Sequence, residues 1–241
     1  FLLCKLEIFQ FKKFKIKQDR CAMKVGTDAV LLGSWVIPNG SAKILDIGTG
    51  TGVIALMIAQ KSNAEITAID IDKDSTEQAQ SNVAESIFHS QIRVLHSSFQ
   101  DLVKTCDKKF NLIITNPPYF IDSLKSNDDT RKIARHTDSL SFGDLLDGVK
   151  KLLDEKGKFC LILPRNEALL FREMAKVKGL YLSKLLRVRT RSEKDSEKRH
   201  IMQFEFKESE FSESTLIIEE DSHRNYTADY KALTKDYYLS F

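Results

Sequence analysis

Residues 43–52 read Lys-Ile-Leu-Asp-Ile-Gly-Thr-Gly-Thr-Gly, and this stretch decides the fold. The run Lys43–Ile47 predicts a short buried strand, and the glycines after it let the backbone turn tightly. The apolar segment Val53–Gln60 then predicts a helix. Ligands of open parallel sheets bind beyond the carboxyl ends of the strands, where this turn lies. The candidate ligand-binding residues of the turn are Asp46, Gly48, Gly50 and Gly52.

Strands and helices alternate along the rest of the chain. Further strands are predicted at 65–71, 92–95, 110–115, 159–163, 180–188 and 201–206, and helices at 75–85, 142–153, 167–177 and 225–239. This alternation predicts an α/β fold with a mostly parallel sheet covered by helices on both faces. The last two strands have no helix between them, which favours an antiparallel edge strand. We therefore expect a seven-stranded, Rossmann-like sheet.

Length and composition fit one such domain with an appendage. The 241 residues are 42% hydrophobic and 29% charged, an ordinary balance for a globular protein. We expect residues 1–40 to form an N-terminal arm that covers cofactor and substrate, and residues 41–241 to form the main domain. The four cysteines are scattered, so neither a disulfide framework nor a metal site is expected. The absence of a signal peptide or a long apolar run favours a cytoplasmic protein.

The glycine spacing resembles the first motif of class I methyltransferases. Val53 stands where the last glycine of a dinucleotide-binding fingerprint would be, so a nicotinamide cofactor is disfavoured. The resemblance implies that the glycine turn holds the amino-acid part of S-adenosyl-L-methionine. Asp70, at the end of the second predicted strand, can accept both hydroxyl hydrogens of a ribose. Asp72 is its rival, although Asp72 also suits a helix cap.

The turn after the third strand departs from the class I pattern. The resemblance places an acidic residue there to bind the adenine of the cofactor, but this chain has serine at position 98. Ser98 and the backbone N–H of Phe99 are the expected replacements, and Asp101 is an alternative. A hydroxyl accepts a hydrogen bond more weakly than a carboxylate does.

Asn116-Pro117-Pro118-Tyr119 directly follows the strand at 110–115. The side-chain oxygen of Asn116 and the carbonyl oxygen of Pro117 can accept both hydrogens of one NH₂ group and direct its lone pair at a methyl donor. Tyr119 offers a ring for stacking a base. The tetrapeptide resembles the catalytic motif of amine and amide N-methyltransferases, and the candidate catalytic residues are Asn116, Pro117 and Tyr119.

Residues 14–35 carry the most specific resemblance. Together with residues 46–52, 116–119, 135–137 and the tail at 225–238, they resemble the bacterial valine-tRNA adenine-N6 methyltransferases, which modify the adenosine 3′ of the anticodon. The resemblance covers nearly the whole chain. It implies transfer of a methyl group from S-adenosyl-L-methionine to adenine N6 in tRNA, with the anticodon stem-loop as partner. The sequence does not give the oligomeric state, and a monomer is our default expectation.

The resemblance also suggests contacts outside the two motifs. Lys24, Thr27 and Asp28 could cover the cofactor, although Asp28 could equally cap a helix over residues 29–35. Basic residues cluster at 1–24 and 184–199 and can neutralise phosphates. The candidate RNA-binding residues are Arg135, His136, Arg187, Arg189 and Arg191. Phe9, Phe11 and Phe14 alternate with polar residues and are expected to face the core.

Three other functions remain open from the residues. A protein glutamine N-methyltransferase carries the same tetrapeptide, but this chain has only about 40 residues before the cofactor strand in which to hold a substrate domain. A DNA adenine-N6 methyltransferase needs a target-recognition domain that is not visible at this length. The chain could also be an RNA-binding module without activity, although intact Asp46 and Asn116 argue against that.

Overall fold

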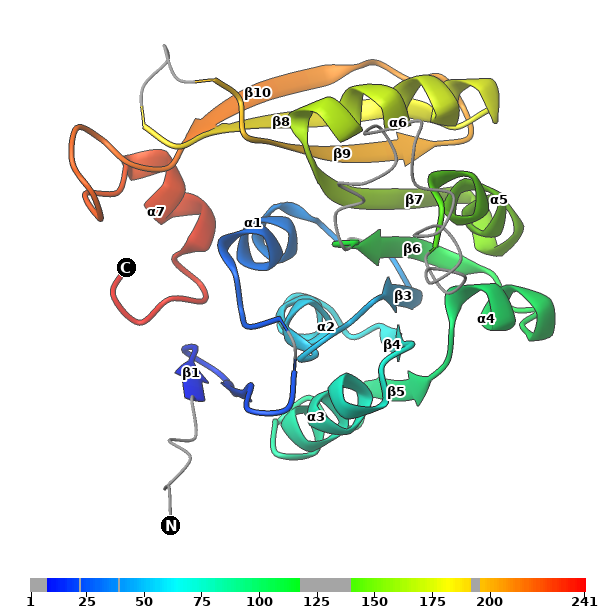
Figure 1. Cartoon of the computed structure of the whole chain (residues 1–241), viewed down its shortest axis with the longest axis horizontal. Helices are drawn as coiled ribbons and strands as arrows, with labels where there is room; N and C mark the ends of the chain where they lie inside the picture. The colour runs from blue at the N-terminus through cyan, green and yellow to red at the C-terminus, as the bar shows by residue number, and fades with distance from the viewer. Residues whose placement is uncertain (1–7, 22, 39, 118–139, 192–195) are drawn as a thin grey trace, which may run out of the picture.

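The computed structural model describes residues 8–21, 23–38, 40–117, 140–191 and 196–241. Eight strands form one sheet in the order β10-β8-β9-β7-β6-β3-β4-β5 (Figure 1). The strands are β3 (Lys43–Ile47), β4 (Glu65–Asp70), β5 (Ile92–His96), β6 (Phe110–Thr115), β7 (Leu153–Pro164), β8 (Tyr181–Arg189), β9 (Arg199–Glu205) and β10 (Ser212–Ile217). The helices are α1 (Thr27–Trp35), α2 (Val53–Ala59), α3 (Lys73–Ala84), α4 (Phe99–Thr105), α5 (Phe142–Leu152), α6 (Arg165–Val177) and α7 (Ala228–Thr234).

The sheet is mostly parallel, as expected, but its edge differs from the prediction. Strand β9 pairs antiparallel with both β7 and β8, and β10 pairs parallel with β8. The antiparallel strand therefore lies inside the sheet and not at its edge, and the strand count is eight instead of seven. The cause is the crossover from β7 through α6 to β8, which leaves a space between these strands that β9 fills.

Helices cover both faces of the sheet. Helices α1, α2, α3 and α7 contribute buried side chains to one hydrophobic cluster, and α4, α5 and α6 contribute to the other. Residues Ile44–Ile47 of β3 are all buried because helices cover both faces of this central strand. None of the helices in the described residues combines the length and apolar character needed to cross a bilayer.

Two helix predictions need correction. Helix α4 was not predicted, because only Phe99 and Leu102 of its seven residues are buried and the sequence shows no helical period. The final helix spans Ala228–Thr234 and not residues 225–239, since the chain after Thr234 forms turns that bury Tyr237. The strand and helix boundaries around the glycine turn agree with the prediction within about two residues.

The N-terminal segment forms a hairpin that packs into the main core. Strands β1 (Ile8–Gln10) and β2 (Lys15–Lys17) pair antiparallel. Phe11 and Phe14 are buried and Phe9 packs against them, which confirms that these rings face the core. The ring centroid of Tyr238, in the C-terminal segment, lies 6.1 Å from that of Phe9, so this segment packs against the N-terminal hairpin.

Candidate active site at the carboxyl edge of the sheet

The glycine turn, residues 48–52, joins the end of β3 to the start of α2. Gly48, Gly50 and Gly52 have φ angles of 69°, 55° and 83°, a region that favours glycine. A Cβ built on Gly48 or Gly50 meets no atom of the described residues within 4 Å, whereas one on Gly52 would lie 3.4 Å from the Cβ of Ala79. Among the described residues, the first two glycines therefore border space in which a ligand can approach the backbone.

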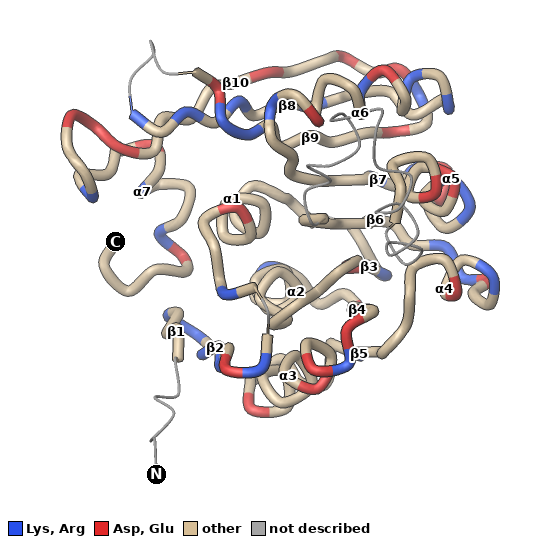
Figure 2. The backbone as a smooth tube through the Cα atoms, viewed as in Figure 1, with Lys and Arg blue, Asp and Glu red and all other residues tan. Residues whose placement is uncertain are grey.

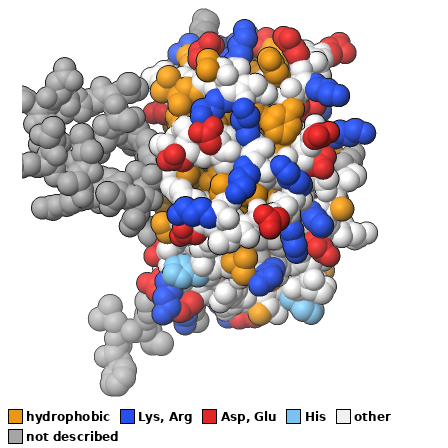
Figure 3. Space-filling model, turned by 90° about the vertical axis from the view of Figure 1, so that its right-hand side faces the viewer, with side chains coloured by type: hydrophobic (Ala, Val, Ile, Leu, Met, Phe, Trp, Pro, Cys, Tyr) orange, Lys and Arg blue, Asp and Glu red, His pale blue; other side chains and the backbone are white. Residues whose placement is uncertain are grey.

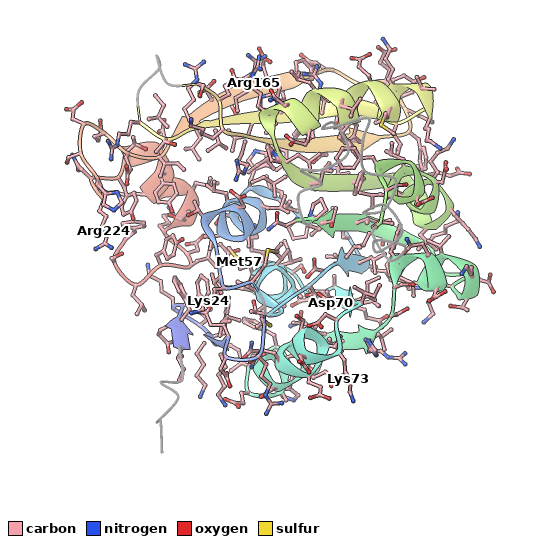
Figure 4. All side chains as sticks on the ribbon, viewed as in Figure 1. Lys24, Met57, Asp70, Lys73, Arg165 and Arg224 are labelled. Carbon is pink, nitrogen blue, oxygen red and sulfur yellow. The ribbon has the colours of Figure 1, made fainter. Side chains whose placement is uncertain are left out.

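Asp70 fixes this turn from the neighbouring strand. Its Oδ2 accepts a hydrogen bond of 2.7 Å from the Gly50 N–H, and its Oδ1 accepts one of 2.9 Å from the Asp72 N–H. Each carboxylate oxygen has a second lone pair, so both can still accept a hydroxyl hydrogen of a ribose. Figure 4 labels Asp70 where β4 ends, beside the start of α2.

Asp72 has a different role. Its side chain accepts a 2.8 Å hydrogen bond from the Ser75 N–H and caps α3. The capping interpretation is confirmed, and the Ser75 hydroxyl together with the Ser75 N–H lowers the pKa of Asp72. Asp72 therefore serves α3, whereas Asp70 contacts the glycine turn directly and remains the candidate ribose acceptor.

Asp46 is buried directly beneath the turn. Its Oδ2 accepts a 2.6 Å hydrogen bond from the Thr49 hydroxyl, while Oδ1 is buried and makes no well-aligned hydrogen bond among the described residues, although the Ala55 backbone N–H also favours the charged form. Burial raises the pKa of Asp46 to about 7. A buried carboxylate oxygen without a donor is costly for the protein alone, and it suits a ligand that brings a donor or a positive charge.

Ser98 and Phe99 form the start of α4. The Ser98 oxygen accepts a 3.0 Å bond from the Asp101 N–H, and its hydroxyl donates a 2.7 Å bond to the Asp101 carboxylate. One lone pair of the Ser98 oxygen therefore remains for a cofactor amine. The Phe99 ring is buried, but its N–H lies in the first helical turn, where no intrahelical acceptor exists.

Ile71 is a candidate site residue that the sequence analysis did not name. It directly follows Asp70 and is 51% exposed, although it is a large apolar side chain. Its carbonyl oxygen lies 2.9 Å from His96 Nε2, which fixes the backbone at this point. An exposed apolar side chain next to the candidate ribose acceptor suits the face of an adenine ring. The signal in the sequence was an isoleucine in a turn that is otherwise acidic.

Asn116 and Pro117 lie where β6 ends beside β3. Thr115 closes β6, is buried, and donates a 2.9 Å hydrogen bond through its hydroxyl to the Ile47 carbonyl. The two strands pair Ile47 with Thr115, so the residues that follow each strand, Gly48 and Asn116, leave the sheet side by side. The structure thus brings the glycine turn and the first half of the tetrapeptide together. Tyr119, Arg135 and His136 lie outside the described residues.

The expected cover residues lie around the start of α1. Lys24 and Thr27 are exposed, and α1 begins after Gly26, which makes no side-chain cap. The idea that Asp28 caps a helix from residue 29 is wrong, because Asp28 lies inside the first turn. Its carboxylate instead pairs with Arg199 at 2.8 Å and joins α1 to β9.

Asn82 connects the N-terminal hairpin to the glycine turn. This buried side chain accepts a 2.9 Å bond from the Lys17 N–H and donates bonds of 2.8 and 2.9 Å to the carbonyls of Lys17 and Thr51. Gln78, one helical turn earlier, accepts a bond from the Arg20 N–H but does not reach the glycine turn. The hairpin and the turn are thus fixed through one residue of α3.

The arginines expected to bind RNA carry acidic partners. Lys and Arg positions gather along β8 and toward its end (Figure 2). Arg187 pairs with Glu213 at 2.7 Å and with Glu197 at 3.4 Å, and Arg189 pairs with Glu197 at 3.5 Å. Arg191 pairs with Glu219 at 3.1 Å. Within the described residues, no group of three or more His, Cys, Asp or Glu side chains could hold a metal ion.

The strand order, the open glycine turn and the acid at the next strand's end define a Rossmann-like methyltransferase of class I. Residues 21–167 match the family model of the methyltransferase small domain, and the chain belongs to that family. Solved structures share the fold. A protein from Agrobacterium tumefaciens described as a predicted O-methyltransferase superposes with a TM-score of 0.67 at 18% identity and covers 87% of this chain and 96% of its own.

Relatives identified by sequence indicate which members of the family this chain resembles closely. The chain is 44% identical to the tRNA1(Val) (adenine(37)-N6)-methyltransferase of Trichodesmium erythraeum, over 97% of this chain and 98% of the relative. It is 43% identical to the enzyme of the same name from Bacteroides fragilis, over 96% and 97%. The resemblance drawn from residues 14–35 and the two motifs is confirmed by these full-length matches.

Proposed function

We propose that this protein methylates the N6 amine of an adenosine in tRNA, at position 37 beside the anticodon of a valine tRNA, with S-adenosyl-L-methionine as methyl donor. The observation that carries the proposal is the meeting of Gly48 and Asn116 at the ends of two paired strands. Near-complete alignment with tRNA adenine-N6 methyltransferases supports the substrate. This alignment favours tRNA as the substrate over a protein glutamine or a DNA adenine, and it favours an active enzyme over an RNA-binding module without activity.

The residues of the turn fit the cofactor. Asp70 would accept the ribose hydroxyls, Ser98 and the Phe99 N–H would bind the adenine edge, and Ile71 would lie against the ring. Asp46, whose Oδ1 makes no well-aligned hydrogen bond among the described residues, would attract the positively charged amino-acid end near Gly48 and Gly50. Lys24, Thr27 and Asp28 would close over it. S-adenosyl-L-methionine supplies an activated methyl group bonded to a sulfonium.

Asn116 and Pro117 orient the amine that is methylated. The Asn116 side-chain oxygen and the Pro117 carbonyl each accept one N–H bond from the adenine amine. Two such bonds favour the pyramidal form, whose lone pair is available, and they direct it along the line of displacement. Tyr119 would stack on the base, a contact worth about 1–3 kcal/mol in comparable proteins. Proton loss to water completes the reaction, so no strong base is needed among the residues of the chain.

The RNA must present its base outside the helix. An anticodon-loop base has to leave its stack to reach a pocket at the sheet edge. Arg135 and His136, together with the basic segment from Arg187 to Arg191, would contact the backbone of the anticodon stem-loop. We expect a monomer to act on tRNA in the cytoplasm.

The test is identification of the product. The protein is incubated with S-adenosyl-L-methionine and total tRNA from a strain that lacks the modification, and the methylated nucleosides are identified by mass spectrometry. N6-methyladenosine in the anticodon-loop fragment of valine tRNA is expected. Methyl transfer to a release-factor peptide or to DNA, with unmodified tRNA, would overturn the proposal.

A further inference from the structure

Three arginines from two elements converge on one carboxylate at the carboxyl edge of the sheet. Glu197 lies 3.7 Å from Arg165 Nε, 3.4 Å from Arg187 Nη1 and 3.5 Å from Arg189 Nη2. Arg165 begins α6, and the other two lie near the end of β8; Figure 4 labels Arg165 at the first turn of α6. The Glu197 side chain is only 12% exposed, so the guanidinium groups surround it.

The ion pairs to Glu197 are not short hydrogen bonds, whereas Arg187 donates a separate 2.7 Å bond to Glu213 through Nη2. Charge-assisted N–H···O⁻ bonds measure about 2.7–2.9 Å, and all three distances to Glu197 are longer. Within the described part of the chain, Arg165 donates no hydrogen bond, and Arg187 Nε is buried without a partner. A guanidinium group whose N–H donors are still available can donate hydrogen bonds to the oxygens of a phosphate.

His200 supports the carboxylate from beneath. Its side chain is 3% exposed, its Nε2 lies 2.8 Å from Glu197 Oε2, and its Nδ1 is buried without a hydrogen-bond partner. Burial lowers the pKa of His200, although the Glu197 carboxylate opposes this. The neutral ring then donates through Nε2 and holds Glu197 in place. The start of α6 adds backbone N–H groups that no side chain caps.

The place of this cluster relates it to the proposed reaction. Arg199, which starts β9, pairs with Pro164 at the end of β7 and with Val188 near the end of β8. The cluster therefore shares the sheet edge with Asn116, at about 10–14 Å if strands are about 4.8 Å apart. Basic side chains alone do not mark such a site, because Lys and Arg are scattered among acidic side chains on the face shown in Figure 3.

We propose that Arg165, Arg187 and Arg189 form a binding site for a backbone phosphate of the RNA, and that Glu197 occupies it until the phosphate takes its place. The inference rests on the proposed function, because it names the phosphate next to the methylated base as the ligand. A phosphodiester carries the same single negative charge as the carboxylate that it replaces. His200 is a positioning residue that holds the Glu197 carboxylate beside the three arginines.

The test measures binding and not turnover. A labelled anticodon stem-loop of valine tRNA is titrated without cofactor at several salt concentrations, with wild type, Arg165→Gln and Arg93→Gln. Arg93 is an exposed arginine of β5 at the opposite edge of the sheet and serves as the control. Arg165→Gln should weaken binding about tenfold at 0.1 M salt and reduce the slope of log affinity against log salt by about 1. Arg93→Gln should change neither.

Glu197→Gln tests the exchange itself. Without the competing charge, RNA should bind about two- to fivefold more tightly at low salt, the opposite direction to Arg165→Gln. Circular dichroism and the melting temperature show whether each variant is folded. An unchanged salt slope for Arg165→Gln, or weaker binding by a folded Glu197→Gln variant, would overturn the inference. Wild type that binds no RNA would instead overturn the proposed function.

Discussion

Replacing Asp70 by alanine should separate the cofactor site from the helix cap beside it. In the structure both Asp70 oxygens already accept backbone N–H bonds, of 2.7 Å from Gly50 and 2.9 Å from Asp72, and each keeps one lone pair for a ribose hydroxyl. A hydrogen bond to a charged group contributes about 1.5–3 kcal/mol. Loss of two ribose bonds therefore removes at least about 3 kcal/mol, and the dissociation constant should rise by about 100-fold or more.

The assay is titration calorimetry with S-adenosyl-L-methionine, and Asp72→Ala is the matched control. Asp72 caps α3 through Ser75, so its loss should lower the free energy of unfolding by about 1 kcal/mol and leave cofactor affinity nearly unchanged. The reasoning is refuted if Asp70→Ala binds the cofactor normally. It is equally refuted if the two substitutions exchange their effects, with Asp72→Ala losing the cofactor.

Three further substitutions, two of them with a matched control variant, test other parts of the structure. The Asp46 pKa of about 7 in the folded protein lies above its unfolded value of 3.8. The free energy of unfolding should therefore fall by up to about 4 kcal/mol between pH 4 and pH 8. Asp46→Asn should abolish that fall when denaturation is measured as a function of pH. Gly148→Ala places a Cβ 2.4 Å from the Phe99 ring and should lower the free energy of unfolding in urea by about 1–3 kcal/mol. The control Gly143→Ala, in the same helix, meets no atom of the described residues closer than 3.6 Å and should not destabilise the protein. Asn82→Ala should weaken cofactor binding and increase hydrogen exchange in the N-terminal hairpin, whereas the control Gln78→Ala should leave cofactor binding intact. Equal effects of the two substitutions on cofactor binding would contradict the link through Asn82.

The central part of the fold was predictable because its signals are local. The strand Lys43–Ile47, the glycines after it and the proline that stops β6 each act within a few residues. Strand β10 was missed, since Ser212–Thr215 are exposed and polar and lack an alternating pattern. The position of β9 between β7 and β8 depends on pairing between distant segments, which no local pattern records.

The sequence predicted which types of residue occur in the candidate site, but it did not predict which partners their side chains contact. The sequence placed carboxylates at 70 and 72 but could not show that the first binds the glycine turn and the second caps a helix. It suggested that Asp28 caps α1, whereas a partner 171 residues away, Arg199, binds it. The shared role of Glu197 likewise depends on three arginines that only the folded sheet brings together.

The most direct test of the central claim is single-turnover methylation by Asn116→Ala with cofactor affinity measured on the same sample. If Asn116 orients the amine, the rate should fall by at least about a hundredfold while the dissociation constant for S-adenosyl-L-methionine stays within about twofold. Asn111→Ala, at the other end of β6, is the control and should retain the rate, because Asn111 bonds only the backbone of residues 42 and 43 among the described contacts. Normal methylation of tRNA by Asn116→Ala would contradict the account.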